Sequence, residues 1–570
     1  MKNMLKSDLT LGDYTPNVGR LFLDNCTRFA KEPAFAQRVN GDYRYWSWEE
    51  FTTDIIRFSY FLQLDGLKPR DRVTIISTNS YLRAVVEMAV MASGMVSVPI
   101  FFGYPLEKMS DLIQFSDSKM LIIENEERLQ QLADQVIPPS VLVLSQTARH
   151  LHEFQHLTVG NFQEEAPQLY NQMISVVPTE QLLIMYTSGT GQDPKGVMLT
   201  HQNILSQQRA LELLWKLPSG LRFLCYLPWH HSFGGLFERF LAFYNGGCLA
   251  IDDSMGKDSD RLFDNFSKIK PHIYFSIPRV YQEIIARVML SEEHREIFFH
   301  ENLKFVFTAA APLPISTSDV FKENHVPVVE GWGLTETSPC CTLTEQKLDR
   351  TPGVVGSAIP EVEVKVIPDG EILVRGPNIM LGYFKRDDLN VQVFDQQGWF
   401  RTGDIGEIGD EGLKIISRKD RIFKLSNAEK VYPVAIEENV RKKCSFIKFI
   451  YVCGSGQAAP LALIFPNLEL LNASHENLKL EQCKKPEGAA QFASCIKECV
   501  RKLNDEWPIK YEKVKQAIVI NRELSIEREE LTPSMKLVPR IIERNYKEYI
   551  NSVVEGRVDD LGDDAYYVQL

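Results

Sequence analysis

The sequence predicts an α/β protein with a large N-terminal domain, in which helices flank parallel sheets, and a small α+β C-terminal domain. The chain has 570 residues, which is too long for one hydrophobic core. Short apolar runs alternate with helical patterns over the first 180 residues, which is typical of parallel sheets covered on both faces. Apolar strand character stops before a charged turn, so we expect domains at residues 1–418 and 419–570.

Local patterns give the first elements. A helix is expected over residues 46–64, because Ser47 and Glu50 have the spacing of a capping box. Residues 88–98 read as a buried helix end followed by a strand, because this apolar run is too short to span a bilayer. The other expected elements are strands at 72–77, 119–124, 140–145, 182–186, 446–452 and 460–465, and helices at 81–92, 203–215 and 489–504.

Composition excludes several classes of protein. The net charge of −12 and the pI of about 5.6 argue against nucleic acid as a standing partner. The N-terminus lacks the apolar segment of a signal peptide, and no transmembrane segment is expected. The ten cysteines include no C-x-x-C pair, which indicates structural thiols in a reducing compartment. We therefore expect a cytoplasmic protein, and peripheral contact with a membrane stays open.

A loop of small and hydroxylated residues follows the apolar run 182–186. Glycines let backbone N–H groups approach a polyphosphate, hydroxyls donate to it, and a lysine adds positive charge. The spacing is not that of a Walker loop, and a surface turn is the alternative. The candidate ATP-binding residues of this loop are Thr187, Ser188, Gly189, Thr190 and Lys195.

Residues 186–197 resemble the phosphate loop of the adenylate-forming superfamily, which includes acyl-CoA synthetases, luciferases and peptide-synthetase adenylation domains. Gly191 and Gln192 depart from the family pattern, where a threonine and a glycine stand. The resemblance extends over roughly residues 10–550 through five motifs in order. Residues 275–284 are similar to long-chain fatty-acyl-CoA synthetases in particular, which favours a fatty acid as the substrate.

Residues 227–235 form the second motif, in which two histidines meet two glycines. A strand-to-helix turn with packed aromatic residues is the plain structural alternative. The resemblance implies that His231 borders the acyl pocket. Gly234 and Gly235, beside Trp229, are expected to leave a slot for an acyl chain, so that leucine at either glycine would shorten the preferred chain.

Residues 330–339 form the third motif. Trp332 offers a flat face to a base, and the Glu336 carboxylate is a hard oxygen ligand suited to Mg²⁺. The resemblance implies that Trp332 lies against adenine, that Thr335 contacts the α-phosphate and that Glu336 binds the metal. Residues 370–378 and 382–384 are strand and turn signals, and we expect their value to be structural.

Residues 398–433 carry the ribose site and the hinge of the family. Asp404 stands on a glycine-flanked turn, where it could instead complete its own turn. The resemblance implies that Asp404 accepts hydrogen bonds from ribose, that Arg418 lies beside it and that Asp420 is the hinge. Asn427 and Ala428 follow where family members have glycine in the loop that lines the tunnel for the thiol.

Residues 531–540 resemble the C-terminal motif of fatty-acyl ligases, which implies that Lys536 is the catalytic lysine of adenylation. The expected activity is conversion of a medium- to long-chain fatty acid to acyl-AMP and then to acyl-CoA, with ATP, Mg²⁺ and CoA as cofactors. Small-domain rotation about Asp420 would serve the two steps. Alternatives are transfer to the phosphopantetheine of an acyl carrier protein, a luciferase-like or amino-acid-activating enzyme, and an inactive nucleotide-binding homologue.

Overall fold

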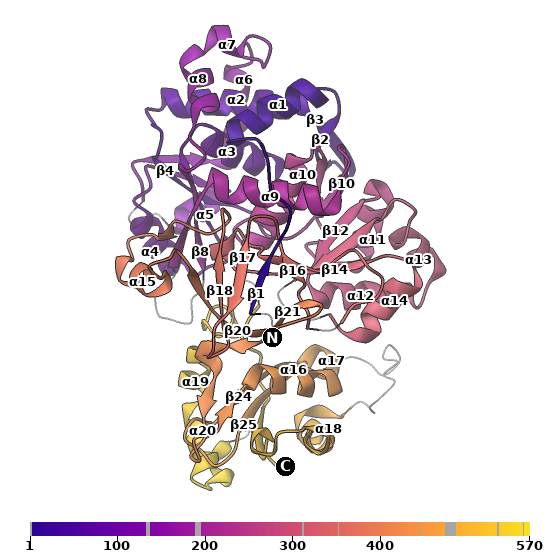
Figure 1. Cartoon of the computed structure of the whole chain (residues 1–570). Helices are drawn as coiled ribbons and strands as arrows, with labels where there is room; N and C mark the ends of the chain where they lie inside the picture. Colours follow the sequence, from indigo (N-terminus) through magenta and orange to yellow (C-terminus); the bar gives the residue numbers. More distant parts are fainter. Residues whose placement is uncertain are drawn as a thin grey trace.

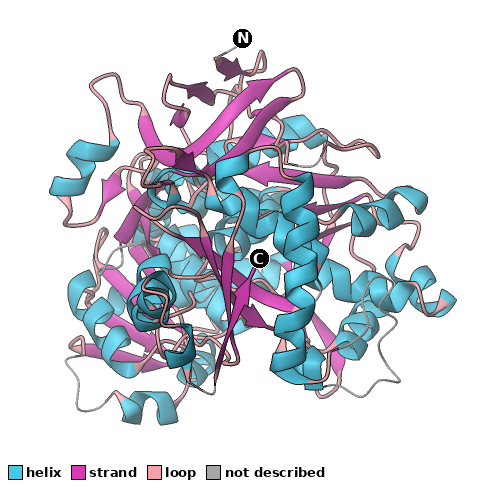
Figure 2. Ribbon diagram, turned by 90° about the horizontal axis from the view of Figure 1, so that it is seen from below, coloured by secondary structure: helices cyan, strands magenta, loops and turns pink. Residues whose placement is uncertain are grey.

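The computed structural model places a large domain above a small one, which carries the C-terminus (Figure 1). Seen from below, the C-terminus lies near the middle of the molecule and the N-terminus at its edge (Figure 2). The structure describes residues 3–132, 137–187, 195–309, 313–351, 353–444, 446–472, 486–532, 535–562 and 564–570.

A seven-stranded sheet forms one half of the large domain, in the order β19-β9-β8-β5-β4-β6-β7. Strands β7, β6, β4, β5 and β8 run parallel, as expected, and β9 and β19 add an antiparallel edge. The bounds are β4 Arg72–Ile76, β5 Val96–Ile100, β6 Met120–Ile123, β7 Ser140–Val143, β8 Gln181–Thr187, β9 Lys195–Thr200 and β19 Gly382–Tyr383.

A nine-stranded sheet forms the other half, in the order β16-β15-β14-β13-β12-β10-β11-β2-β3. Its central strands, from β14 to β2, are parallel. The bounds are β2 Pro33–Val39, β3 Asp42–Ser47, β10 Arg222–Cys225, β11 Cys248–Ile251, β12 Ile273–Ser276, β13 Phe305–Thr308, β14 Val328–Trp332, β15 Thr342–Leu343 and β16 Ser357–Ala358.

Helices between the two sheets share one hydrophobic core with both of them. Helix α2 begins as expected, since Ser47 Oγ accepts from Glu50 N and Glu50 Oε2 accepts from Ser47 N. These helices are α1 Val18–Phe29, α2 Trp48–Leu64, α3 Tyr81–Ala92, α6 Thr147–Glu153, α7 Phe162–Glu165, α8 Pro167–Ser175, α9 His201–Trp215 and α10 Arg239–Tyr244. The outer faces are covered by α4 Leu106–Ser116 and α5 Glu126–Gln131 on one sheet, and by α11 Ser259–Ile269, α12 Pro278–Val288, α13 Glu292–Phe298 and α14 Ile315–Glu323 on the other.

A third sheet of the large domain is antiparallel throughout, whereas the sequence led us to expect parallel sheets. Two of its strand pairs are joined by short turns, one of them at Gly370, and a short turn permits only antiparallel pairing. The order is β1-β17-β18-β20-β21, with bounds Met4–Lys6, Glu363–Val366, Glu371–Arg375, Phe400–Gly409 and Gly412–Arg418. Helix α15 spans Asp387–Val393.

The small domain is a four-stranded sheet with helices, as expected for an α+β unit. Its strands lie in the order β24-β25-β26-β27, and a short hairpin, β22–β23, precedes them. The bounds are β22 Phe423–Lys424, β23 Lys430–Val431, β24 Ile447–Cys453, β25 Leu461–Pro466, β26 Gln516–Ile520 and β27 Ala565–Gln569, with α16 Pro433–Lys443, α17 Leu468–Asn472, α18 Gly488–Glu506, α19 Pro539–Asn545 and α20 Lys547–Val554. Short helical turns are η1 Leu144–Gln146, η2 Phe233–Glu238, η3 Thr335–Thr337, η4 Lys419–Arg421, η6 Lys510–Glu512 and η7 Val558–Leu561.

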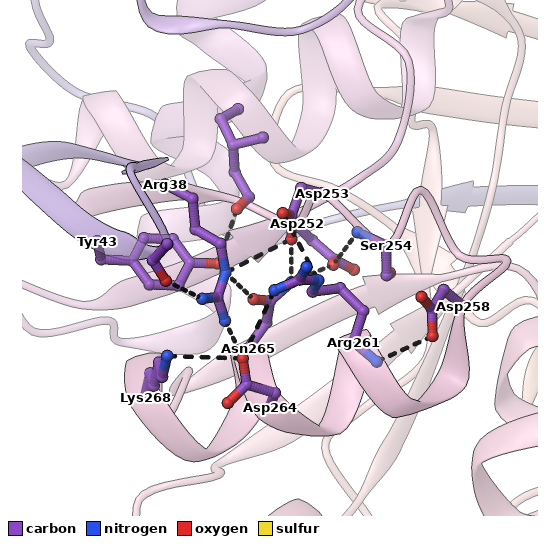
Figure 3. Close-up of polar contacts among 12 residues, drawn as sticks. Arg38, Tyr43, Asp252, Asp253, Ser254, Asp258, Arg261, Asp264, Asn265 and Lys268 are labelled. Atoms are coloured by element: carbon purple, nitrogen blue, oxygen red, sulfur yellow. Dashed lines mark hydrogen bonds and ion pairs between the residues drawn. The ribbon is translucent and has the colours of Figure 1, made fainter.

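A charged cluster anchors the β2–β3 edge hairpin on α11 (Figure 3). Arg38 donates through Nε to Asn265 Oδ1 at 2.8 Å and also pairs with Asp264. Asn265 Nδ2 in turn donates to Asp252 Oδ1 at 2.7 Å, at the end of β11. The cluster therefore ties the hairpin at the edge of the nine-stranded sheet to α11.

Within the part of the chain that the structure describes, no helix is long and apolar enough to cross a membrane. The described cysteines form no disulfide. Seven of them are buried, and burial raises the pKa of thiols such as Cys341, to about 12. The expectation of structural thiols is consistent with this arrangement.

Candidate functional site

Two sheets meet around the carboxylate of Asp404. Strand β14 ends at Trp332, and the β20–β21 hairpin places Asp404 opposite Arg418. Trp332 Nε1 donates to Asp404 Oδ2 at 2.8 Å, and Arg418 Nη1 donates to Asp404 Oδ1 at 2.8 Å. Asp404 is 4% exposed, so these two bonds fix its carboxylate where the nine-stranded and antiparallel sheets join.

Burial raises the pKa of Asp404, while the positive charge of Arg418 and the bond from Trp332 act in the opposite direction. Each carboxylate oxygen has two acceptor positions and uses one of them here. A pair of neighbouring hydroxyls could occupy the remaining positions. The ribose role expected for Asp404 and Arg418 stays a prediction, and the structure brings both residues together with Trp332.

The turn η3 lies next to this corner and carries Thr335 and Glu336. The hydroxyl of Thr335 lies 3.2 Å from that of Ser232, which directly follows His231. Glu336 Oε1 accepts a hydrogen bond of 2.7 Å from the hydroxyl of Tyr383. The third motif and the histidine motif, about a hundred residues apart in sequence, are thus in contact.

Lys536 reaches the same place from the small domain. Its side chain keeps access to solvent and lies within range of the charges of Asp404 and Arg418. The protein around it lowers the pKa of Lys536, with a further lowering by the charge of Arg418 and an opposing effect of Asp404. The pKa of His231 falls to about 4, through burial and then through the charge of Lys536. The two domains therefore share one electrostatic site.

The strands on either side of the phosphate loop also end here. Thr187 closes β8 and pairs in register with Lys195, which opens β9. The Nζ atom of Lys195 lies 5.2 Å from the centre of the Tyr383 ring, within the range of a cation–π contact. Three expected phosphate ligands lie outside the described residues: Ser188, Gly189 and Thr190.

His231 has a defined tautomer. Its Nδ1 atom accepts a hydrogen bond of 3.3 Å from the backbone N–H of Phe233. With a pKa near 4 the ring is neutral at physiological pH, so its proton resides on Nε2. His231 is therefore a hydrogen-bond donor through Nε2.

The two glycines of the histidine motif have a packing role that the sequence analysis missed. A Cβ atom at Gly234 would lie 2.5 Å from the carbonyl oxygen of Leu227, and one at Gly235 would lie 2.2 Å from that of Trp229. Both glycines thus let the π-helical turn η2 approach the preceding loop. A leucine there would displace the backbone, so the expectation that it would simply shorten the acyl slot is wrong.

Trp229 is fully buried between two guanidinium groups. The Cζ atoms of Arg83 and Arg239 lie 5.7 and 4.9 Å from the centre of its ring. Both arginines are buried and share Glu87 as their carboxylate partner. Trp229 and this ion-pair network thus hold the loop that carries His231. The expected place of Trp229 in the acyl pocket stays a prediction.

Four phenylalanine rings pack together beside His231. Phe233 and Phe237 come from η2, Phe275 ends the apolar part of β12, and Phe307 lies in β13. Centroid distances within this phenylalanine cluster run from 4.8 Å, between Phe237 and Phe307, to 6.4 Å, between Phe233 and Phe237. The rings are almost fully buried and form the apolar surroundings of the motif.

Four residues of the site were not predicted from the sequence: Ser232, Tyr383, Phe237 and Phe307. A helical period from Phe233 points to Phe237 on the same face. Tyr383 gives no such signal, because its neighbours in space are far away in sequence. Its motif was expected to be structural, and it instead contacts both Glu336 and Lys195.

The donor set at η3 suits Mg²⁺. Glu336 and Thr335 offer hard oxygen atoms, and Mg²⁺ is usually held by one or two carboxylates together with substrate phosphates. No group of three or more His, Cys, Asp or Glu side chains able to hold a metal occurs among the described residues. A single carboxylate that shares the ion with a nucleotide fits this arrangement, and a cage made of protein ligands alone does not.

Comparison with known proteins gives two matching families. The model described as AMP-binding enzyme matches residues 22–384, and the one described as AMP-binding enzyme C-terminal domain matches residues 420–557. A probable CoA ligase, CCL6, of Humulus lupulus is 26% identical and covers 90% of this chain and 88% of its own. Long-chain-fatty-acid–CoA ligase 5 of Rattus norvegicus is 26% identical over 91% of this chain and 85% of its own.

Solved structures share the fold. ATP-bound MatB from Rhodopseudomonas palustris superposes with a TM-score of 0.73 at 20% identity, over 94% of this chain and 99% of its own. The O-succinylbenzoate CoA synthetase MenE from Bacillus subtilis, in complex with AMP, gives a TM-score of 0.72 at 18% identity, over 92% and 97%. The expected fold class, with a large α/β domain and a separate C-terminal domain, is confirmed.

Proposed function

The chain belongs to the AMP-binding enzyme family, and we propose that it converts a medium- to long-chain fatty acid to acyl-AMP and then to acyl-CoA. It is an adenylate-forming CoA ligase, with ATP, Mg²⁺ and CoA as its cofactors. One observation carries the proposal. Lys536 of the small domain shares the environment of Asp404, Arg418 and His231 of the large domain.

In the first step a carboxylate oxygen of the acid attacks the α-phosphorus of ATP, and pyrophosphate leaves. Catalysis of phosphoryl transfer consists mainly of positioning and of neutralising negative charge. Lys536 supplies a positive charge, Thr335 supplies a hydroxyl, and the Nε2–H of His231 can hold the attacking carboxylate. A bound Mg²⁺ at Glu336 would neutralise phosphate charge. Asp404 and Arg418 would hold the ribose and thereby fix the α-phosphorus relative to Lys536.

In the second step the CoA thiol attacks the acyl carbonyl, and AMP leaves. Lys536 lies near Asp404 and His231 in the present arrangement, and we propose that the small domain turns before the thiol step. The contacts around η4 support a hinge at Asp420. Lys419 pairs with Asp369 and Glu371 of the large domain, whereas Arg421 pairs with Glu437 of the small domain.

Asp420 is thus the residue between two anchored neighbours. Rotation about its backbone moves Lys536 and leaves Asp404 and Arg418 in place. Domain motions of this kind at a few chain positions are common in enzymes that assemble a different site for each step.

The fatty-acid assignment is supported by the apolar wall beside His231. The phenylalanine cluster offers no polar group to a substrate tail, and its rings come from η2, which follows His231, and from β12 and β13. The stretch 275–284, which resembles long-chain enzymes, begins with one of these rings. The names of the curated relatives agree with this class of acid. Burial of each methylene is worth roughly 0.8 kcal/mol, so kcat/KM should rise about fourfold per added CH₂ until the space is filled.

The test is release of AMP across carboxylic acids from acetate to palmitate, with benzoate and cinnamate added, in the presence and absence of CoA. A flat profile or an optimum on an aromatic acid would overturn the substrate class. Absence of ATP–pyrophosphate exchange with every acid would favour an inactive nucleotide-binding homologue.

One observation motivates an acyl carrier protein, in place of CoA, as the acceptor of the acyl group. Ala428 adopts a φ of 66° in the loop where the family has glycine, and Asn427 adds a further side chain. These two side chains would change the surface that meets the pantetheine arm, which CoA and an acyl carrier protein have in common. Replacing CoA with a phosphopantetheine-bearing carrier protein, at equal thiol concentration, distinguishes the two acceptors.

A further inference from the structure

We propose that Tyr383 is a positioning residue that holds Glu336 and Lys195 apart and ready for a metal-bound nucleotide. This inference rests on the proposed function and concerns the same site. The Tyr383 hydroxyl donates to Glu336 Oε1 at 2.7 Å, and its ring lies 5.2 Å from Lys195 Nζ. One side chain therefore contacts both the expected magnesium ligand and the expected phosphate lysine.

The backbone of Tyr383 is fixed from two sides. On one side β19 pairs with β9, with Tyr383 opposite Val197, two residues beyond Lys195. On the other side Asn390 of α15 accepts from the Tyr383 N–H at 2.7 Å and donates to its carbonyl at 3.1 Å. Tyr383 is 3% exposed, so its ring has little freedom to move.

Glu336 is fixed to the same segment by a second bond. The backbone N–H of Met380 donates to the carbonyl of Glu336 at 2.9 Å. The main chain and the side chain of Glu336 are thus both tied to residues 380–383. The Glu336 carboxylate then presents its second oxygen, Oε2, to a ligand in a set direction.

The ring also separates two opposite charges. Lys195 and Glu336 carry opposite charges and would be expected to form an ion pair. A nucleotide would then have to break that pair in order to bind. No ion pair joins Lys195 and Glu336, both of which the structure describes. Lys195 lies over the aromatic face, and Glu336 accepts from the hydroxyl.

The test compares Tyr383→Phe with the parent protein. This variant keeps the ring over Lys195 and removes the bond to Glu336. Hydrogen bonds to charged groups make a large contribution, so Mn²⁺–ATP binding, followed by electron paramagnetic resonance, should weaken roughly tenfold. Binding of ATP without metal, followed by calorimetry, should not change. That split separates positioning of the carboxylate from a general loss of structure.

Two further variants make the result specific. Glu336→Asp keeps the charge but shortens the side chain, so it should weaken Mn²⁺–ATP binding. The double variant with Tyr383→Phe should lose little more, because the shorter carboxylate no longer reaches the tyrosine hydroxyl. Tyr43→Phe is the matched control, because it removes a 2.8 Å bond from a tyrosine hydroxyl to the Ile251 carbonyl, outside the site. It should leave Mn²⁺–ATP binding unchanged.

Unchanged or tighter Mn²⁺–ATP binding in Tyr383→Phe would overturn the inference, as would equal losses with and without metal. The binding assay needs neither a carboxylic acid nor a thiol. An incorrect substrate assignment would therefore leave this result intact, whereas failure of the parent protein to bind Mn²⁺–ATP would count against the proposed function itself.

Discussion

Truncation of Phe237 to alanine is expected to lengthen the acyl chain that the enzyme prefers. Phe237 lies in η2, six residues after His231, and contacts the rings of Phe275 and Phe307 at 5.4 and 4.8 Å. It is 1% exposed. Removal of this ring opens space inside the apolar wall, next to the residue expected to hold the substrate carboxylate.

The magnitude follows from the size of the ring. The substitution removes about six carbon atoms and leaves room for about four methylenes, each worth roughly 0.8 kcal/mol on burial. Efficiency on the longer acid should therefore rise by up to about 200-fold relative to the acid preferred by the parent. The loss of stability should be about 3–5 kcal/mol, which is tolerable for a domain of ordinary stability.

The assay is kcat/KM for AMP release over a series of fatty acids below their micelle concentrations. Phe240→Ala is the matched control, because Phe240 is fully buried on the next turn of the continuing helix and makes no ring contact with the phenylalanine cluster. The control should lose similar stability and keep the parent profile. An unshifted profile in Phe237→Ala, or the same shift in both variants, would refute the assignment of the cluster to the acyl pocket.

Four other substitutions have defined outcomes. Lys536→Ala should lower adenylation by roughly 10²–10³-fold and spare thioester formation from supplied acyl-adenylate, and equal loss in both half-reactions would contradict its role. Glu336→Gln removes a ligand charge, so the Mg²⁺ concentration needed for pyrophosphate exchange should rise about tenfold with an unchanged melting temperature. Ala428→Gly removes a strained φ of 66° and should raise the free energy of unfolding of the small domain by about 0.5 kcal/mol in urea titrations. Burial lowers the pKa of His201 to about 3, so below pH 6.5 the unfolded chain binds a proton that the folded chain does not. The free energy of unfolding should fall by about 1.4 kcal/mol per pH unit between pH 6 and 4 because of this group, and His201→Gln should flatten that part of the curve.

Much of the fold could be predicted from local patterns. The helix at Trp48–Leu64 begins at its predicted capping box, the helix predicted at residues 81–92 is α3, and the strand predicted to follow it is β5. These elements are long or strongly periodic, so local chemistry determines them. The antiparallel third sheet was missed, because β1 pairs with β17 and β18 pairs with β20 across long stretches of chain, and local patterns do not reveal such partners.

Some residues of the candidate site could likewise be predicted from local patterns, and others could not. Residues in contiguous motifs, such as Thr335 and Asp404, were found because their neighbours in sequence identify them. Tyr383 was missed because its role depends on the pairing of β19 with β9, which no local pattern encodes. The glycines of the histidine motif were found but misinterpreted, since a sequence does not tell whether a missing side chain makes room for a ligand or for backbone.

The position of the β22–β23 hairpin indicates which half-reaction the present arrangement serves. Asn427 and Ala428, at the tip of this hairpin, are exposed to solvent while Lys536 faces Asp404. A loop exposed in this way cannot line a tunnel to the acyl carbonyl. The two functions therefore exclude each other in one conformation, because the Lys536 loop and the hairpin belong to the same small domain. We infer that the present arrangement is the one that serves adenylation. Rotation at Asp420 would then move Lys536 out of the site and bring the β22–β23 hairpin into it before the thiol attacks.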